Sequence, residues 1–347
     1  MKKNYDSIDL FKFIFSILIV ALHADALYDL SPLANTLICG GIARLGVPFF
    51  FVASAFFFFK KPVTWDNTKK YCKRLLILYA AWFIVSLPKT VFDRFICSDY
   101  PLPETIFRFI RSFFVTSTFS GSWFIVSCIW CALLFYLLEK QKTSVRRTIV
   151  IALSILVYAW TVFTSAYGKT LDGLGMRDFY EKYVLLFGSP YCSFIVGIPY
   201  FAIGRYFAVK DSKKQDGDRN KRPVVYAGLA ACLALLLTEV WFTNTRGLTA
   251  STDCYVMLLP TTVFLFMIIK DLGIEIKRAK LLRVASTIIF FSQFILLFTC
   301  ELAEWAFKIT IPNIGKFLFA AIFGLFLTWL ILKLQNKKGF GWLRRFY

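Results

Sequence analysis

The sequence has little charge and almost no histidine: only 18% of its 347 residues are charged, and His23 is its single histidine. Soluble domains carry about 25% charged residues, so this composition excludes an ordinary soluble enzyme. Nine cysteines are present, but no pair of them has the further cysteines or histidines nearby that a metal site needs. Cys128 and Cys131 form a CxxC motif inside an apolar run, where we interpret both as packing residues. We therefore expect no metal.

Apolar residues make up 58% of the chain. They form blocks of about 17–23 residues, the length at which a helix crosses a bilayer. Membrane β-strands would alternate in segments of about ten residues, which these unbroken blocks do not. We predict an all-α polytopic membrane protein, a single domain over 1–347, of about ten transmembrane helices at 8–27, 38–59, 74–95, 122–139, 148–166, 190–208, 224–242, 255–271, 284–303 and 315–334. The stretch 104–117 is apolar but carries Arg108 and Arg111, which favours an interfacial helix.

The basic residues lie mostly on one side of these predicted spans. The termini and the loops on their side carry about four times as many Lys and Arg as the opposite loops. This bias predicts that both termini are cytoplasmic, and it explains the net charge of +20 without nucleic acid. The same loops are expected to bind anionic membrane lipids.

The first apolar block also resembles a secretory signal, with Lys2 and Lys3 before it and Ala24-Asp25-Ala26 after it. Cleavage there would still leave a chain made almost entirely of membrane helix. We therefore favour an uncleaved first span.

Two polar residues of this first span, Lys12 and His23, are eleven positions apart. A helix turns about 100° per residue, so both lie on one face, roughly 16 Å apart along the axis. Such a face suits a water-filled or substrate-filled path, because charged groups in lipid cost on the order of 2.5–3.5 kcal/mol each. The structural alternatives are a Lys12 that snorkels to the inner headgroups and a His23 that bonds to a neighbouring helix.

Four further residues are candidates near the outer ends of spans. Arg44 either snorkels outward or holds an anion or sugar near His23. Glu239 either pairs with Arg44 or His23 or reaches the outer interface. Glu301 either contacts a polar substrate or is solvated, and Trp123 either anchors the interface or stacks on a sugar ring.

Several stretches resemble acyltransferase family 3, the OafA-like membrane O-acyltransferases. "IDLFKFIFSILIVALH" resembles the opening helix, whose hallmark is a basic residue, ten residues and a histidine. "RLGVPFFFVASAFFF", "KKYCKRLLILY", "GSWFIVSCIW", "IVGIPYFAIGRYFA" and "LLRVASTIIFFSQFILL" resemble the second, third, fourth, sixth and a late helix. The membrane region is also similar to that of the vancomycin-type serine racemases, but we expect no racemase domain to follow.

Two departures from the family pattern concern histidines. The late-helix histidine is replaced by Gln293, with Phe290 in place of the tyrosine before it, and Ser122 stands where some members have a histidine. We interpret both as variation, because His23 and its motif remain.

The resemblance implies an enzyme of the bacterial cytoplasmic membrane. It would transfer an acyl group, usually acetyl, from cytoplasmic acyl-CoA to a hydroxyl of a glycan or lipid-linked saccharide outside. In that mechanism His23 would be the general base and Arg44 would stabilise the oxyanion. Glu239, a candidate partner of either residue by its position in the chain, is the third catalytic candidate. Trp123, Gln293 and Glu301 would contact the acceptor, and the basic residues Lys12, Lys69, Lys70, Lys73 and Arg74 would bind the CoA phosphates.

Two alternatives to the enzyme stay open at this point. A transporter or flippase would suit ten helices with charges in the membrane, although no inverted repeat is found. A sensor or structural membrane module is a second alternative, against which the short loops argue. A homodimer is compatible with any of them.

Overall fold

The computed structural model describes residues 5–212 and 222–347, and within these ranges every regular element is a helix. The helices of the first half are α1 (Asp6–His23), α2 (Pro32–Ala34), α3 (Gly46–Phe59), α4 (Trp65–Val91), α5 (Leu102–Ser112), α6 (Trp123–Glu139) and α7 (Thr143–Ser165). Those of the second half are α8 (Arg177–Phe187), α9 (Ile198–Ser212), α10 (Arg222–Thr245), α11 (Leu258–Lys270), α12 (Ala279–Phe307) and α13 (Asn313–Leu334). Short 3₁₀ or π segments are η1 (Asn35–Cys39), η2 (Ile42–Leu45), η3 (Phe92–Ile96), η4 (Gly168–Leu171), η5 (Pro190–Cys192) and η7 (Gly341–Phe346).

Within the described ranges, six helical segments are long and apolar enough to span a bilayer: Pro32–Phe59, Trp65–Ile96, Thr143–Ser165, Pro223–Thr245, Ala279–Phe307 and Asn313–Leu334. The apolar helices α6 and α11 are shorter. All ten predicted spans coincide with a helix, so the all-α prediction is confirmed within the described ranges. The count of ten spans and the cytoplasmic side of the termini stay predictions.

Two predicted spans differ in detail from the structure. The sixth helix begins at Ile198 instead of 190, because Pro199 fits the first turn of a helix, where its missing N–H leaves no bond unmade. The second span is irregular at Gly40 and Gly41, between a π and a 3₁₀ segment. Pro48 lies in the first turn of α3, where a proline is tolerated because its missing N–H leaves no helical bond unmade.

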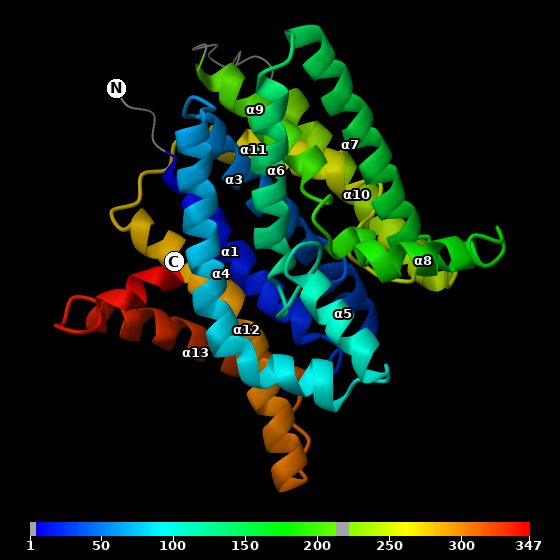
Figure 1. Ribbon diagram of the computed structural model, residues 1–347, viewed down its shortest axis with the longest axis vertical. Coiled ribbons are helices and arrows are strands. Elements are labelled where there is room, and N and C mark those ends of the chain that lie inside the picture. Colours follow the sequence, from blue (N-terminus) through cyan, green and yellow to red (C-terminus); the bar gives the residue numbers. More distant parts are fainter. Residues whose placement is uncertain (1–4, 213–221) are drawn as a thin grey trace.

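Helix α1 lies inside the bundle (Figure 1), where it packs against α12, α3 and α11. Helix α3 packs closely on α9, since a Cβ at Gly204 would lie only 2.5 Å from the Cβ of Ala55. Small residues permit such close approach between membrane helices. The core is unusually aromatic, with Phe49, Phe51 and Phe56 of α3 fully buried.

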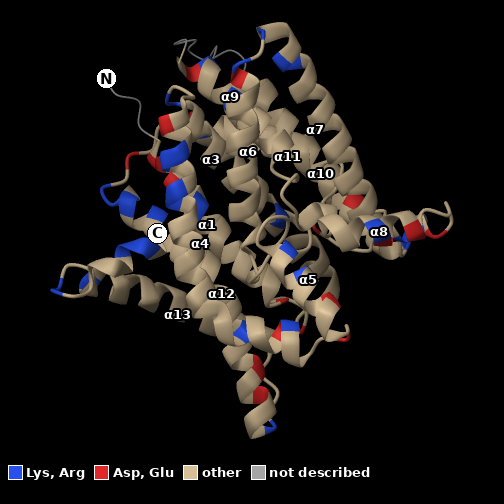
Figure 2. Cartoon of the chain, in the orientation of Figure 1, with Lys and Arg blue, Asp and Glu red and all other residues tan. Residues whose placement is uncertain are grey.

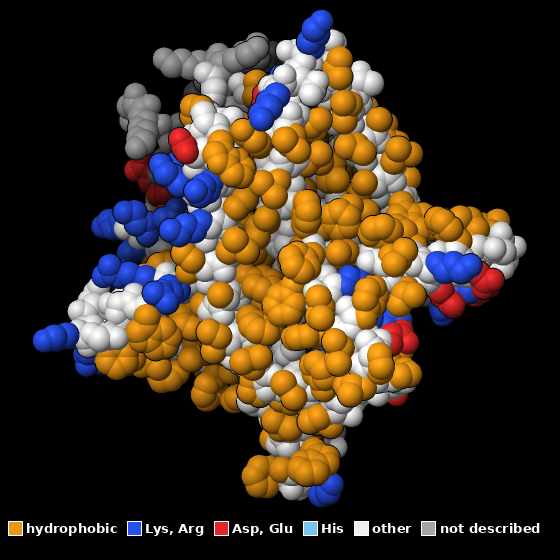
Figure 3. Space-filling model, in the orientation of Figure 1, with side chains coloured by type: hydrophobic (Ala, Val, Ile, Leu, Met, Phe, Trp, Pro, Cys, Tyr) orange, Lys and Arg blue, Asp and Glu red, His pale blue; other side chains and the backbone are white. Residues whose placement is uncertain are grey.

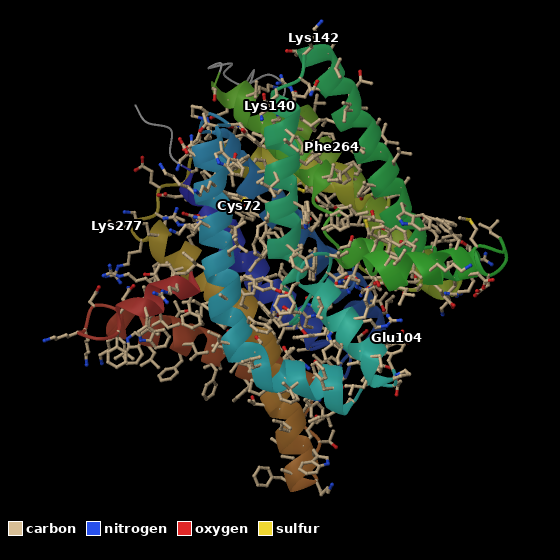
Figure 4. The ribbon with its side chains drawn as sticks, viewed as in Figure 1. Cys72, Glu104, Lys140, Lys142, Phe264 and Lys277 are labelled. Carbon is tan, nitrogen blue, oxygen red and sulfur yellow. The ribbon has the colours of Figure 1, made fainter. Side chains whose placement is uncertain are left out.

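The outer surface matches a membrane environment. Hydrophobic side chains cover most of the face in Figure 3, and lysines and arginines gather along one flank. In Figure 2 lysine and arginine positions gather along the first half of α4 and near the C-terminus. Lys140 and Lys142 lie at one end of the molecule and Glu104 of α5 lies toward the other (Figure 4). We call these ends inner and outer, following the predicted topology.

Candidate functional site

A cavity of about 430 Å³ lies at the end of α1. Its walls come from α1, η2, α3, η3 with the end of α4, the loop before α6, the segment around η5, the loop before α11, and α12. Three of the eleven residues predicted for the site, His23, Arg44 and Trp123, line it together. They are 21 and 79 positions apart along the chain, so the fold alone brings them together.

His23 presents its ring to this cavity. The side chain is exposed and belongs to the cavity wall, so its accessible surface faces the cavity. The ring centroid lies 4.8 Å from that of Phe294, with the two planes inclined by 54°. Within the described part of the chain, no hydrogen bond or ion pair involves the imidazole. Its nitrogens are therefore available to a ligand.

The position of His23 is fixed by where α1 ends. It is the last residue of the helix, and Asp25 two positions later has a left-handed backbone with φ of 46°. The Asp25 carboxylate accepts a hydrogen bond of 2.9 Å from the side-chain amide of Asn35. This turn stops the helix and leaves His23 in its final turn, at the wall of the cavity.

Arg44 is paired with an acidic residue that the sequence did not single out. Its guanidinium donates to the Asp253 carboxylate and to the Thr252 hydroxyl, while its Nε is buried without a partner. Both Arg44 and Asp253 act electrostatically on His23. The imidazole therefore faces a compensated ion pair, and not a lone cation.

The loop that carries Asp253 is tied to the end of α7. The backbone amides of Ala250 and Cys254 donate to Ser165, at 3.0 Å to its carbonyl and 2.9 Å to its hydroxyl. The Ser165 hydroxyl in turn donates to the carbonyl of Ser251 at 2.7 Å. Three bonds to one serine hold this irregular loop beside the cavity, as buried backbone groups require.

Glu239 does not contact Arg44 or His23, and it does not line the cavity. Its carboxylate accepts hydrogen bonds from the amides of Val256 and Met257, at 2.7 and 2.9 Å, and from the Tyr167 hydroxyl at 3.1 Å. Those amides precede α11, so Glu239 satisfies unpaired N–H groups at a helix start. This geometry is that of a structural residue.

The three residues predicted to contact the acceptor do not lie together in the structure. Trp123 lines the cavity, with its ring centroid 6.0 Å from that of Phe51. Gln293 is fully buried outside the cavity and donates to the carbonyl of Phe290 at 2.8 Å. Glu301 is exposed near the end of α12 and does not line the cavity. Only Trp123 is therefore placed to touch a molecule bound beside His23.

The five predicted donor-binding residues, here called the inner basic group, do not line the cavity. Lys69, Lys70, Lys73 and Arg74 are exposed on the first half of α4. Lys12 is half-buried, and its ammonium lies 5.5 Å from the centre of the Phe57 ring. The cavity reaches along α1 from His23 only as far as Ile19.

A small polar cluster lies close to Lys12. The hydroxyls of Ser54 and Tyr71 are 2.7 Å apart, and the Cys128 thiol lies beside both. Lys12 and Arg74 act electrostatically on that thiol. The cluster joins α3, α4 and α6 in the interior, and none of its three members lines the cavity. The three polar groups contact one another because a buried polar group costs free energy unless it is paired.

Several cavity residues escaped the sequence analysis. Lys89 and Arg94 line the cavity, and Lys89 pairs with Asp93 at 3.1 Å. Lys89 and Arg94 lie at the end of a predicted span, where a cationic side chain normally snorkels to the lipid headgroups, so nothing in the sequence singles them out. Asp253 had one signal, an acidic residue in the short polar segment "TASTDCY", but nothing in it named Arg44 as the partner. Among the described residues, no group of three or more His, Cys, Asp or Glu side chains is arranged to hold a metal ion.

A helical bundle with six helices able to cross a bilayer and an interior cavity at the end of the first helix defines a multi-pass membrane protein. The family model described as an acyltransferase domain, acyltransferase family 3, matches residues 5–333. The chain belongs to this family. It is also similar to an amino-acid racemase of Enterococcus faecalis, with 26% identity over 272 residues, and covers 36% of that protein's length with 77% of its own. No solved structure matches the chain.

Proposed function

We propose that this membrane acyltransferase moves an acyl group, in particular acetyl, from cytoplasmic acyl-CoA to a hydroxyl of an envelope polysaccharide or lipid-linked saccharide. In this proposal ten helices cross a bacterial cytoplasmic membrane, both termini are cytoplasmic, and the His23 cavity faces the acceptor side. The observation that carries the proposal is the single histidine of the chain, which lies exposed in the cavity with no protein group on its nitrogens.

The chemistry follows from one proton transfer. The neutral imidazole takes the proton of the acceptor hydroxyl as its oxygen attacks the thioester carbonyl. The C–O bond forms, the C–S bond breaks, and the imidazolium returns the proton to the departing CoA thiolate. Arg44 lines the same cavity and is the proposed charged donor to the developing oxyanion, and its ion pair with Asp253 holds it in place.

The donor must travel from the inner basic group to His23, along the face of α1 that carries Lys12. CoA is polyanionic, so the exposed cations of α4 suit its phosphates. The cluster of Ser54, Tyr71 and Cys128 supplies polar groups beside Lys12 on this route. Because the cavity ends at Ile19, the proposal requires the route to open further when the donor binds.

The test is transfer of label from acetyl-CoA to the glycan fraction of membranes that carry wild-type protein or His23→Ala. General-base catalysis contributes about 10²–10⁴-fold, so the variant should lose at least 100-fold in rate. His23→Gln, which keeps a polar group of similar size, serves as a matched control and should be equally inactive. If the protein is a transporter, wild-type membranes form no labelled glycan, whether or not His23→Ala changes uptake. That result would overturn the proposal.

A further inference from the structure

A second pocket, of about 380 Å³, adjoins the His23 cavity. The two share Asp93, Arg94, Ser117 and Cys192 in their walls. The remaining walls come from the segment between η3 and α5, from α5 itself, and from the residues that flank the end of α8. A molecule that extends beyond the first cavity would therefore enter the second one past Arg94.

Three arginines line this pocket: Arg94, Arg108 and Arg111. Arg108 is paired with Glu104 at 2.7 Å, and its guanidinium lies 4.0 Å from the centre of the Tyr100 ring. Arg94 and Arg111 form no direct ion pair among the residues that the structure describes. Asp93 and Asp99 also line the pocket, and Asp93, which pairs with Lys89, acts electrostatically on Arg94. Three arginines against two aspartates leave the lining with an excess of positive charge.

The protein contacts of these two arginines do not use all their donors. Arg94 donates to the carbonyl of Ser117 at 2.8 Å. Arg111 donates to the carbonyls of Val184 and Leu185 near the end of α8, and its Nε is buried without a partner. A guanidinium has five N–H donors, so both keep donors for a further acceptor.

The arrangement costs free energy in the empty protein. Burial, followed by the charges of Arg108 and Arg94, lowers the pKa of Arg111 below its ordinary value. Outer segments of membrane proteins also tend to be poor in arginine. A cluster of like charges at that end of the molecule therefore indicates a ligand that supplies the missing negative charge.

We propose that this pocket binds an anionic group, a carboxylate or phosphate, carried by the acceptor, with Arg94 and Arg111 as its ligands. This rests on the proposed function, and it narrows the acceptor to an acidic glycan or a phosphate-bearing saccharide. The shared wall then orients the molecule, because an anion held in the second pocket directs the neighbouring sugar toward His23. Guanidinium groups suit this task because they bind carboxylate and phosphate in a bidentate manner.

The experiment measures ligand binding to the purified full-length protein in a neutral detergent, by the rise in Tm with ligand concentration. The probes are inorganic phosphate, D-glucuronate and neutral D-glucose. Wild type should bind at least one anion ten times more tightly than glucose. Arg94→Gln should lose at least tenfold in that affinity, and Arg94→Lys should lose less. Equal binding of glucose and both anions, or an unchanged Arg94→Gln, would overturn the proposal.

Arg177→Gln is the matched control, because Arg177 is an exposed arginine that pairs with Asp172 at 2.6 Å outside both pockets. It should bind the anions like wild type. Repeating the titrations in nanodiscs of phosphatidylcholine or phosphatidylglycerol distinguishes a lipid headgroup from an acceptor as the source of the anion. Loss of sugar-acid binding only in phosphatidylglycerol would mean that a lipid headgroup occupies the pocket, and it would overturn the acceptor assignment. The assay contains no acyl-CoA. A wild type that acylates glycan without binding anions would therefore contradict this inference alone, whereas anion binding without acylation would contradict the proposed function alone.

Discussion

The cavity around His23 and the inner basic group differ in how completely each is formed. At the cavity, side chains from distant parts of the chain already surround a space large enough for a sugar. At the inner end, the basic residues lie mostly exposed on one helix and line neither of the two pockets. In the function proposed above, this difference corresponds to a preformed acceptor site and a donor route that opens on binding. It also distinguishes the cavity residues, whose positions the fold fixes, from the inner basic group, which supplies positive charge.

The largest effect is expected at the Arg44–Asp253 ion pair. Arg44→Gln leaves Asp253 half-buried without its partner, and breaking such a pair costs about 3–5 kcal/mol when it is fully buried, somewhat less here. Transfer should fall about 100-fold, because the oxyanion also loses its charged donor. Asp253→Asn in the same chain should recover most of the lost stability and little of the activity. Thermal unfolding and label transfer measure the two separately, and equal recovery of both would reduce Arg44 to a structural residue.

A smaller effect is expected at the inner basic group. Lys69→Gln with Lys70→Gln and Lys73→Gln should raise the KM for acyl-CoA by about tenfold at low ionic strength and leave kcat unchanged, since exposed charges are screened by salt. Lys140→Gln with Lys142→Gln, at the same end of the molecule (Figure 4), is the control and should leave KM unchanged. An equal KM for acyl-CoA in the Lys69/Lys70/Lys73 variant and in the Lys140/Lys142 control would mean that CoA enters elsewhere.

The smallest effect on catalysis is expected at Glu239. Glu239→Gln weakens the bonds to the amides before α11, and an impaired buried hydrogen bond costs about 1–3 kcal/mol. Tm should fall, while the rate per folded molecule should stay within twofold of wild type. A rate loss at an unchanged Tm would restore the catalytic role that the sequence alone suggested.

The sequence predicts the helices well because hydrophobic length and charge bias are local properties. It places Lys12 and His23 on one face of α1, since that needs only the helical repeat. It does not predict that Arg44 pairs with Asp253 or that Glu239 binds the start of α11, because these contacts join segments far apart in the chain. The family pattern assigns Gln293 to the site, yet the α12 residues that line the cavity are Phe290, Phe294 and Ile295. Which face of a buried helix points inward depends on its neighbours, and an apolar helix carries no pattern that shows it.

The most direct test of the central claim uses sealed membrane vesicles that hold labelled acetyl-CoA only on the cytoplasmic face. The account predicts that glycan on the opposite face becomes labelled, that His23→Ala abolishes this labelling, and that unlabelled acetyl-CoA added on the glycan side does not compete. Labelling only when donor and glycan are on the same face would contradict a single imidazole that serves both sides of the membrane.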